Sequence, residues 1–340
     1  MPLETTVTNI MDFLGLIIPA LSVLSVTVNC CHVIILTRKS VTSSSMNTLL
    51  IGIAIVDILA PIVYVKQGIW SVLGLWDDFC DVPGYYGILA TLILRAINDD
   101  FRRCSTWFGL SLAVIRTVSV KMAAKKSFNA ISESRFGVKV IVVLVFLSSL
   151  ITVSYLFRYQ IVQDDEHACV TSSGIVISTS KFSIEELVNK VEVGGPARRI
   201  HILLTGIFGQ LIPSFLFPIF AVILVLELRK PEKKSSTSIR FRTEKISKMV
   251  IYMTVTFLVI EFPIGIGKIA NSMQTESTIP HNWNQIFNYF YVPMTMFHCF
   301  ICFRMSSQYR RTALSLLGVE RKPTVSLANQ STYVTSVMNK

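Results

Sequence analysis

Apolar stretches long enough to cross a lipid bilayer recur seven times along this chain, and polar segments separate them. About 20 consecutive apolar residues form a helix that spans the hydrocarbon core. Backbone polar groups find no water there, so a spanning segment is helical by default. The predicted spans are residues 11–36, 47–73, 84–120, 137–158, 201–227, 247–269 and 284–304. The pattern predicts an all-α membrane protein, a seven-transmembrane helix bundle.

The composition agrees with a membrane protein. Of the 340 residues, 51% are hydrophobic and only 16% are charged, whereas a soluble domain carries about 25% charged residues. We expect no cleavable leader, because the first apolar run is long and no small-residue cleavage site clearly follows it. No nucleophile arrangement, paired carboxylates or phosphate-binding loop indicates an enzyme.

The charges between the spans predict the orientation of the chain. Lys and Arg gather in alternate connecting segments: Arg38, Lys39, Lys121, Lys125, Lys126, Arg135, Lys139, the loop 228–248, Arg304, Arg310 and Arg311. The other segments carry Glu4, Asp77, Asp78, Asp81, Asp164, Asp165 and Glu166. The positive-inside rule then predicts a multi-pass plasma-membrane protein with its N-terminus outside and its C-terminus in the cytoplasm. The net charge of +11 is explained by this topology and by attraction to anionic membrane lipids, so nucleic acid is not an expected partner.

The seven cysteines include no CxxC pair and no His at metal-ligand spacing, so neither a metal site nor a cofactor is expected. Cys80 in LWDDFCD and Cys169 in the loop 159–200 both fall on the predicted outer side. That compartment is oxidising, so we expect a disulfide between them, with two free thiols as the alternative. The other five cysteines lie within predicted spans.

Four formal charges occur near the middle of the third span, in the segment NDDFRRCSTWFG: Asp99, Asp100, Arg102 and Arg103. Ionisable residues inside a membrane are functional candidates. Their spacing of three and four residues also allows pairing within the helix, so a purely structural network is the competing interpretation.

Helical spacing separates these residues by direction. Arg95, Asn98, Asp99, Arg102 and Thr106 share one stripe, whereas Asp100 and Arg103 point further aside. Other polar or aromatic candidates for a pocket are Glu261, Tyr85, Trp283 and Tyr289. For the aromatic residues, ordinary helix packing is the stronger alternative.

Further polar residues lie in other spans. Asn29, Asp57 and Ser105 are expected to share one buried polar site, and a packing cluster explains them equally well. His298 in MFHCFICF is expected to be a packed, hydrogen-bonded residue of this polar core. Arg116 follows the apolar run LAVI at the cytoplasmic end of the third span, where snorkelling to the interface is the alternative.

These residues together resemble the rhodopsin-like G-protein-coupled receptor pattern over nearly the whole chain. Asn29, the pair Ala54 and Asp57 in AIVD, and Arg116 match its motifs in helices one, two and three. Pro213 and Pro263 match the prolines of helices five and six, and MSSQYRRTALSLL looks like its amphipathic eighth helix. The resemblance divides the chain into four segments, which are an extracellular N-terminus 1–10, a receptor domain 11–304, an amphipathic helix 305–318 and a cytoplasmic tail 319–340.

More specifically, DDFRRCSTWFGLSLAVIRTVSVK and MSSQYR resemble nematode serpentine receptors of class W, which are related to the FMRFamide peptide receptors. The chain departs from the general pattern at several motifs. Ile115 replaces the Asp before Arg116, Glu261 stands where helix six usually has a Trp, and FHCFI replaces NPxxY. Loss of that Asp predicts raised basal activity, unless Glu244 supplies the partner of Arg116.

The resemblance implies a receptor that binds an extracellular peptide or chemosensory ligand and activates a heterotrimeric G protein. It places the stripe from Arg95 to Thr106, with Glu261, in the ligand pocket. It assigns coupling and activation to Arg116, Pro213, Pro263 and Glu244. A transporter or channel is the alternative, although the sequence has no internal repeat and an odd number of spans. A retinal protein is disfavoured because residues 284–304 contain no lysine.

Overall fold

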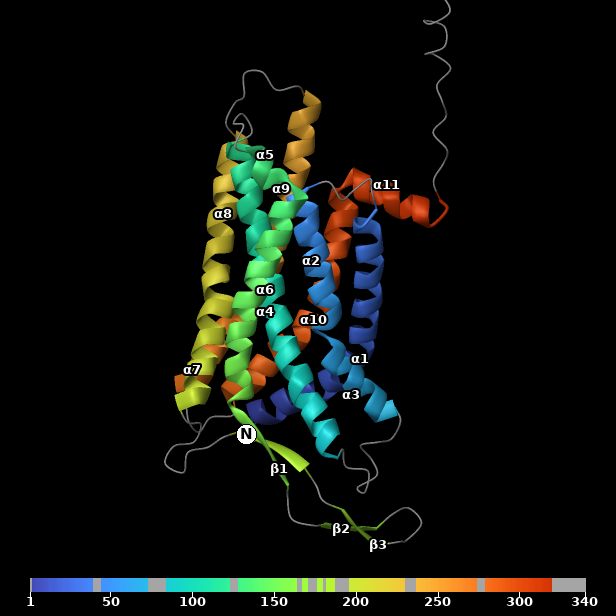
Figure 1. Ribbon diagram of the computed structural model, residues 1–340, viewed down its shortest axis with the longest axis vertical. Coiled ribbons are helices and arrows are strands. Elements are labelled where there is room, and N and C mark those ends of the chain that lie inside the picture. Colours follow the sequence, from blue (N-terminus) through green and yellow to red (C-terminus); the bar gives the residue numbers. More distant parts are fainter. Residues whose placement is uncertain are drawn as a thin grey trace, which may run out of the picture.

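The computed structural model describes residues 2–38, 44–72, 84–122, 128–163, 167–170, 176–179, 182–186, 196–229, 237–273 and 279–319. The helices are α1 (Pro2–Leu36), α2 (Ser45–Leu59), α3 (Ile62–Val72), α4 (Tyr85–Lys121), α5 (Phe128–Ser132), α6 (Ser134–Leu156), α7 (Pro196–Leu204), the π-helix η1 (Thr205–Leu211), α8 (Ile212–Arg229), α9 (Thr237–Met273), α10 (Ile279–Met305) and α11 (Ser307–Leu316). The strands are β1 (Tyr159–Gln163), β2 (His167–Val170), β3 (Val176–Thr179) and β4 (Phe182–Glu186). The long helices form one bundle with strands at one end, here the β end, and α11 at the other, the α11 end (Figure 1).

Within the described residues, six helical segments are long and apolar enough to cross a membrane: Thr6–Leu36, Ser45–Trp70, Ser134–Leu156, Arg199–Glu227, Ile251–Ala270 and Gln285–Met305. The seventh helix, α4, is 37 residues long and carries several charged residues, including Asp99, Asp100, Arg102 and Arg103. It packs against α2, α3, α6, α8 and α9, so it lies in the interior of the bundle. The structure thus has a helix for each predicted span, and the seven-helix prediction is confirmed.

The surface around the bundle is apolar. Phe146 on α6 and Phe215 on α8 are 62% and 59% exposed, and many other large apolar side chains are similarly open. So continuous an apolar surface is unusual for a soluble monomer. It suits contact with lipid, which requires no polar face on the outside of the helices.

The second predicted span, 47–73, is divided in two at Pro61. Proline lacks the backbone N–H that a helix interior needs, and α2 ends just before it while α3 begins just after it. The carbonyl of Ala60 instead accepts a hydrogen bond of 2.7 Å from the Asn98 amide nitrogen on α4. Asn98 therefore stabilises the break, and its side chain is directed at α2.

The fifth span, predicted as 201–227, contains the π-helix η1. The N–H of Ile212 bonds to the carbonyl of Ile207, five residues back. Continuation of this pattern would require an N–H from Pro213 for the Phe208 carbonyl, which proline lacks. The indole nitrogen of Trp107 on α4 donates to that carbonyl at 3.1 Å, so Pro213 and Trp107 together account for this local geometry.

The loop 159–200 contains strands that the sequence analysis did not predict. β1 pairs with β4 and β2 pairs with β3, both antiparallel. The two short sheets lie at the β end, beyond the helices (Figure 1). Strands this short give only a weak pattern of alternating apolar and polar residues, so the sequence did not predict them.

The last helix, α11, lies within the predicted segment 305–318 and turns away from the bundle axis (Figure 1). The Ser306 hydroxyl caps its start by accepting from the N–H of Tyr309 at 3.2 Å. Tyr309 is buried, and its hydroxyl lies 2.7 Å from Nδ1 of His32 on α1. Burial raises the pKa of the Tyr309 phenol, so the group stays a neutral hydroxyl. At the other terminus, α1 starts at Pro2, so most of the predicted N-terminal segment 1–10 is helical.

We predict that Gly137→Ala destabilises the bundle. A Cβ at Gly137 on α6 would lie 2.8 Å from the Ser45 carbonyl oxygen of α2, so the two helices would have to separate. Overpacking of this kind costs roughly 1–3 kcal/mol, and a lower melting temperature in detergent is the expected readout.

Gly15→Ala is the matched control, because nothing lies within 4 Å of a Cβ at Gly15. It should be neutral or mildly stabilising, since alanine favours a helix more than glycine does. Equal effects of the two substitutions would refute the close packing of α2 and α6.

Candidate functional site

Six ionisable side chains meet inside the bundle and are named here the charge layer. Four come from α4 and two from α9: Asp99, Asp100, Arg102, Arg103, Glu261 and Lys268. The prediction of buried charge in the third span is confirmed, and Lys268 is an addition that the sequence analysis missed.

The first ion pair of the layer joins Arg102 on α4 to Glu261 on α9. The guanidinium donates twice, from Nη2 to Oε2 at 3.1 Å and from Nε to Oε1 at 3.3 Å. Arg102 also donates from Nη1 to the side-chain oxygen of Asn288 on α10 and lies over the ring of Tyr291. Both members of the pair are almost fully buried. A two-pronged pair of this kind fixes the orientation of both side chains, so Arg102 ties α4 to α9 and α10.

The second group centres on Asp99. One of its oxygens accepts from Lys268 Nζ at 3.2 Å, and the other accepts from Arg103, one turn along α4. When the side-chain amide of Gln210 is oriented to suit its neighbours, its oxygen accepts from Lys268 at 3.2 Å. Asp99 therefore pairs within α4, as its spacing suggested, and also across to α9.

Arg103 and Asp100 face α6. Ser148 Oγ donates to Asp100 at 2.5 Å, and Ser149 Oγ donates to its other oxygen at 3.0 Å. Arg103 donates to the Ser148 carbonyl at 3.2 Å and to the Thr152 hydroxyl. The two residues thus hold α6 against α4, in agreement with the prediction that they point aside from the central stripe.

The charge layer is electrically balanced, with three carboxylates and three cations. Burying an ion pair costs desolvation that the attraction offsets only with good geometry and further hydrogen bonds. Here each carboxylate accepts from at least one cation, and Asp100 also accepts from two hydroxyls. The layer is therefore satisfied by its own members and neighbours without a bound ligand.

The structure gives the predicted stripe residues different surroundings. The Thr106 hydroxyl donates to the Arg102 carbonyl at 3.2 Å and is buried, and Asn98 binds the Ala60 carbonyl. Asp99, Arg102 and Thr106 do lie on inward-facing turns of α4, but their polar groups are occupied. Arg95 is exposed and makes no hydrogen bond or ion pair among the described residues.

A second polar cluster, centred on Asp57 of α2, lies closer to the α11 end. Ser105 Oγ donates to Asp57 Oδ1 at 2.9 Å, the Tyr291 hydroxyl donates to the same oxygen at 3.2 Å, and Nδ1 of His298 lies 2.9 Å from Oδ2. The predicted proximity of Asp57 and Ser105 is confirmed, and His298 is a packed, hydrogen-bonded residue as expected.

Asn29 does not join this cluster, contrary to expectation. Its amide nitrogen donates to the Ser25 carbonyl at 3.0 Å, on its own helix. Ser25 in turn bonds to Thr295 on α10 at 2.6 Å between hydroxyl oxygens. The reason is that the Asn29 amide nitrogen bonds within α1, next to the point where Ser25 joins α1 to α10.

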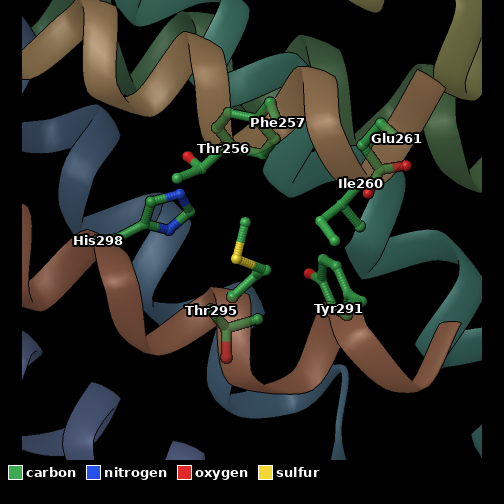
Figure 2. Close-up of a pocket in the computed structure, with 8 residues that line it drawn as sticks. Thr256, Phe257, Ile260, Glu261, Tyr291, Thr295 and His298 are labelled. Carbon is green, nitrogen blue, oxygen red and sulfur yellow. The ribbon is translucent and has the colours of Figure 1, made fainter. Parts of the chain in front are cut away.

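A small cavity lies between α9 and α10, from Glu261 at one end to His298 at the other. Figure 2 shows Glu261 and Tyr291 on one side of it and Thr256, Thr295 and His298 on the other. It leaves about 20 Å³ for the centre of a water molecule, which is room for one or two waters. The cavity thus lies between Glu261 of the charge layer and His298 of the Asp57 cluster, and it suits water and is too small for a ligand.

The residues predicted to act in coupling lie on α4, α8 and α9. Arg116 is buried near the α11 end of α4, and Pro263 lies inside α9, where it interrupts helical hydrogen bonding. Pro213 is the second residue of α8, which directly follows η1. Glu244 belongs to α9 on the α11 side of Pro263.

Several other predicted residues are placed only in part. Cys80 lies outside the described residues, and Cys169 is described only by its position in β2. Trp283 belongs to α10. Tyr289 packs edge-on to Tyr64, with ring centroids 6.0 Å apart, and Tyr85 packs similarly on Phe182 of β4.

Seven long helices in one bundle, six of them apolar enough to cross a membrane in the part of the chain that the structure describes, together with buried polar clusters at two levels and a short transverse helix at one end, define a seven-transmembrane receptor architecture. The chain belongs to the Srw family: residues 16–320 match the model described as "Serpentine type 7TM GPCR chemoreceptor Srw". The match spans α4 and both polar clusters, and it confirms the resemblance to class W receptors. It also identifies the chain as a multi-pass membrane receptor of the G-protein-coupled class and not an enzyme. None of the curated proteins matches the chain.

We predict strong coupling between Arg102 and Glu261. Arg102→Met and Glu261→Leu should each cost about 3–5 kcal/mol, because each leaves an uncompensated buried charge. The double variant should be more stable than either single variant. A double-mutant cycle on unfolding in detergent measures the interaction.

Glu133→Leu, which removes an exposed carboxylate, is the control and should change stability little. Additive losses in the Arg102 and Glu261 variants would contradict a direct buried pair.

Proposed function

We propose that this receptor binds an extracellular ligand at the β end of the bundle and activates a heterotrimeric G protein at the α11 end. The observation that carries the proposal is the family match over residues 16–320. The finer assignments of ligand side, coupling side and residue roles rest on the arrangement of charge within the bundle.

The proposed orientation puts the β end outside the cell and the α11 end in the cytoplasm. Described basic residues near the α11 end are Arg38, Lys121, Arg135, Lys139, Arg304, Arg310 and Arg311. An excess of Lys and Arg marks the cytoplasmic side of a membrane protein. The ligand therefore enters at the β end, and the plasma membrane is the site of action.

The proposed mechanism is a shift between two arrangements of the bundle. A ligand that binds one arrangement more tightly increases its population. The charge layer joins α4 to α6, α9 and α10. A ligand bound on the β-end side of the layer can therefore bias the relative positions of these helices. Arg116 then contributes to the surface that receives the G protein, and Glu244 is proposed as its partner in the resting state.

The kinks and irregular turns give the helices places to bend. Pro263 lies two residues after Glu261 on α9, and Pro213 follows η1 at the start of α8. Bending at these points changes the positions of the α11 ends of α8 and α9 relative to their β ends. We therefore assign Pro213 and Pro263 to activation.

The first test is nucleotide exchange on purified heterotrimers representing the main G-protein classes, catalysed by the reconstituted receptor. Because the two arrangements of the bundle are in equilibrium without ligand, we expect measurable basal exchange without added ligand. Arg116→Ala should abolish it while leaving surface expression unchanged. Lys121→Ala, which removes an exposed cation on the same helix, should keep it.

Full exchange by Arg116→Ala would contradict the role of Arg116. Receptor-dependent solute flux in liposomes without exchange on any heterotrimer would favour a transporter or channel instead.

We also propose a Cys80–Cys169 disulfide, which would hold the loop containing β2 to the segment before α4. Cys80→Ser and Cys169→Ser should then lower surface expression equally, and the double variant should be no worse than either. Strongly additive defects would show that the two cysteines act separately.

A further inference from the structure

Arg95 is a cation on an inward-facing stripe and has no hydrogen-bond or ion-pair partner among the described residues. It shares a stripe of α4 with Thr91, Asn98 and Arg102, and those three side chains contact α3, α2 and α9. A residue on this stripe points into the bundle. Arg95 is nonetheless exposed, so the bundle is open at its level. The surface at the β end that includes Arg95 on α4, Lys66 on α3 and Tyr289 on α10 is named here the vestibule.

Its depth follows from helix geometry. Arg95 is ten residues from the start of α4 at Tyr85, about 15 Å along the axis, and seven residues, about 10 Å, before Arg102. Arg95 therefore lies between the β end and the charge layer. A ligand that enters the vestibule meets Arg95 before it reaches the buried ion pairs.

A second cation, Lys66 on α3, lies near Arg95. Its ammonium donates to the Thr91 hydroxyl at 2.5 Å and to the Gly87 carbonyl at 3.1 Å, and it lies 3.9 Å from the ring centre of Trp70. All three partners are neutral. Lys66 and Arg95 are close enough to repel each other, so the vestibule carries two positive charges that no described carboxylate offsets.

The carboxylates of the charge layer are already paired. Asp99, Asp100 and Glu261 pair with the cations of the charge layer, and Asp12 lies on an exposed face of α1 without an ion pair among the described residues. A cationic ligand would therefore find no free carboxylate in the charge layer. An anionic one would meet two cations whose charge it can neutralise.

Aromatic rings border the same space. Tyr64 on α3 packs against Tyr289 on α10 and lies within electrostatic reach of Arg95. Trp70 lies beside Lys66. Rings of this kind suit an apolar body attached to the charged group.

We propose that the receptor recognises a ligand with a carboxylate on an apolar body, and that Arg95 and Lys66 bind the carboxylate. The proposal rests on ligand binding at the β end, as argued above, and adds the chemical class of the ligand. Arg95 provides a planar fork that suits a carboxylate, and Lys66 adds a second charge. The free C-terminus of a peptide and a small organic acid share this chemistry.

The test measures thermal stabilisation of the purified full-length receptor by matched acid and amide probes. One arm compares a mixed-sequence tetrapeptide library ending in Phe with a free carboxylate against the same library with a C-terminal amide. The other arm compares 3-phenylpropionate and octanoate with their primary amides. We expect stabilisation by the acids of at least one arm and little by the amides. The arm that responds identifies a peptide or a small acid as the source.

Variants assign the effect to residues. Arg95→Gln and Lys66→Gln should each weaken acid binding roughly 10- to 100-fold, which is the contribution of a hydrogen bond to a charged group. Arg95→Lys should restore part of it. Because Arg95 makes no described hydrogen bond, Arg95→Gln should leave the melting temperature without probe unchanged. Arg135→Gln removes an exposed cation at the opposite end and should bind acids normally.

Equal stabilisation by acids and amides, no stabilisation by the acids, or an acid effect that survives Arg95→Gln and Lys66→Gln would overturn the proposal. Nucleotide exchange distinguishes this failure from failure of the proposed function. Acid binding that needs Arg95 but never accompanies exchange would leave the ligand class standing and refute G-protein activation. Exchange stimulated by amides alone would support G-protein activation and refute the proposed ligand class.

Discussion

The structure depends on the mutual neutralisation of six charges inside the bundle, at a level where the lipid hydrocarbon supplies neither hydrogen bonds nor opposite charges. Arg102 and Glu261 form the strongest link, because two hydrogen bonds join a planar guanidinium to a carboxylate that is almost fully buried. A buried pair of this kind rarely adds stability over an apolar contact of similar size. Its retention is better explained by what it specifies, namely the relative positions of α4, α9 and α10.

The charge layer also divides the bundle into two halves with different tasks. Toward the β end, Arg95 and Lys66 keep positive charge that described carboxylates do not offset. Toward the α11 end, the Asp57 carboxylate forms hydrogen bonds with side chains of α4 and α10. A cavity with room for one or two waters lies between His298 of this cluster and Glu261. A ligand in the outer half therefore has to act on the inner half through the helices of the charge layer, because the space between is too small for the ligand itself.

The sequence predicted the seven spans well, because length and hydropathy are sufficient for a membrane helix. It also separated Asp99 and Arg102 from Asp100 and Arg103 by direction, which needs only helical periodicity. Lys268 and Lys66 were missed although both fall inside predicted spans, where the rule that intramembrane charges are functional candidates applies to them equally.

Other parts of the site could not be read from one helix at a time. Ser148, Ser149 and Thr152 are ordinary residues in a membrane helix, and only the packing of α6 on α4 turns them toward Asp100 and Arg103. Asn98 was expected in the ligand pocket, but the break at Pro61 leaves a carbonyl that its amide binds.

The central claim is that the charge layer closes the bundle between Arg95 and Thr106. The most direct measurement is modification of Arg95→Cys and Thr106→Cys receptors by a membrane-impermeant, charged thiol reagent added from the β end, with the parent chain as background. Both substitutions leave all six charges of the layer in place. The account predicts rapid modification at position 95 and only background reaction at position 106. Modification of Thr106→Cys as fast as that of Arg95→Cys would contradict it.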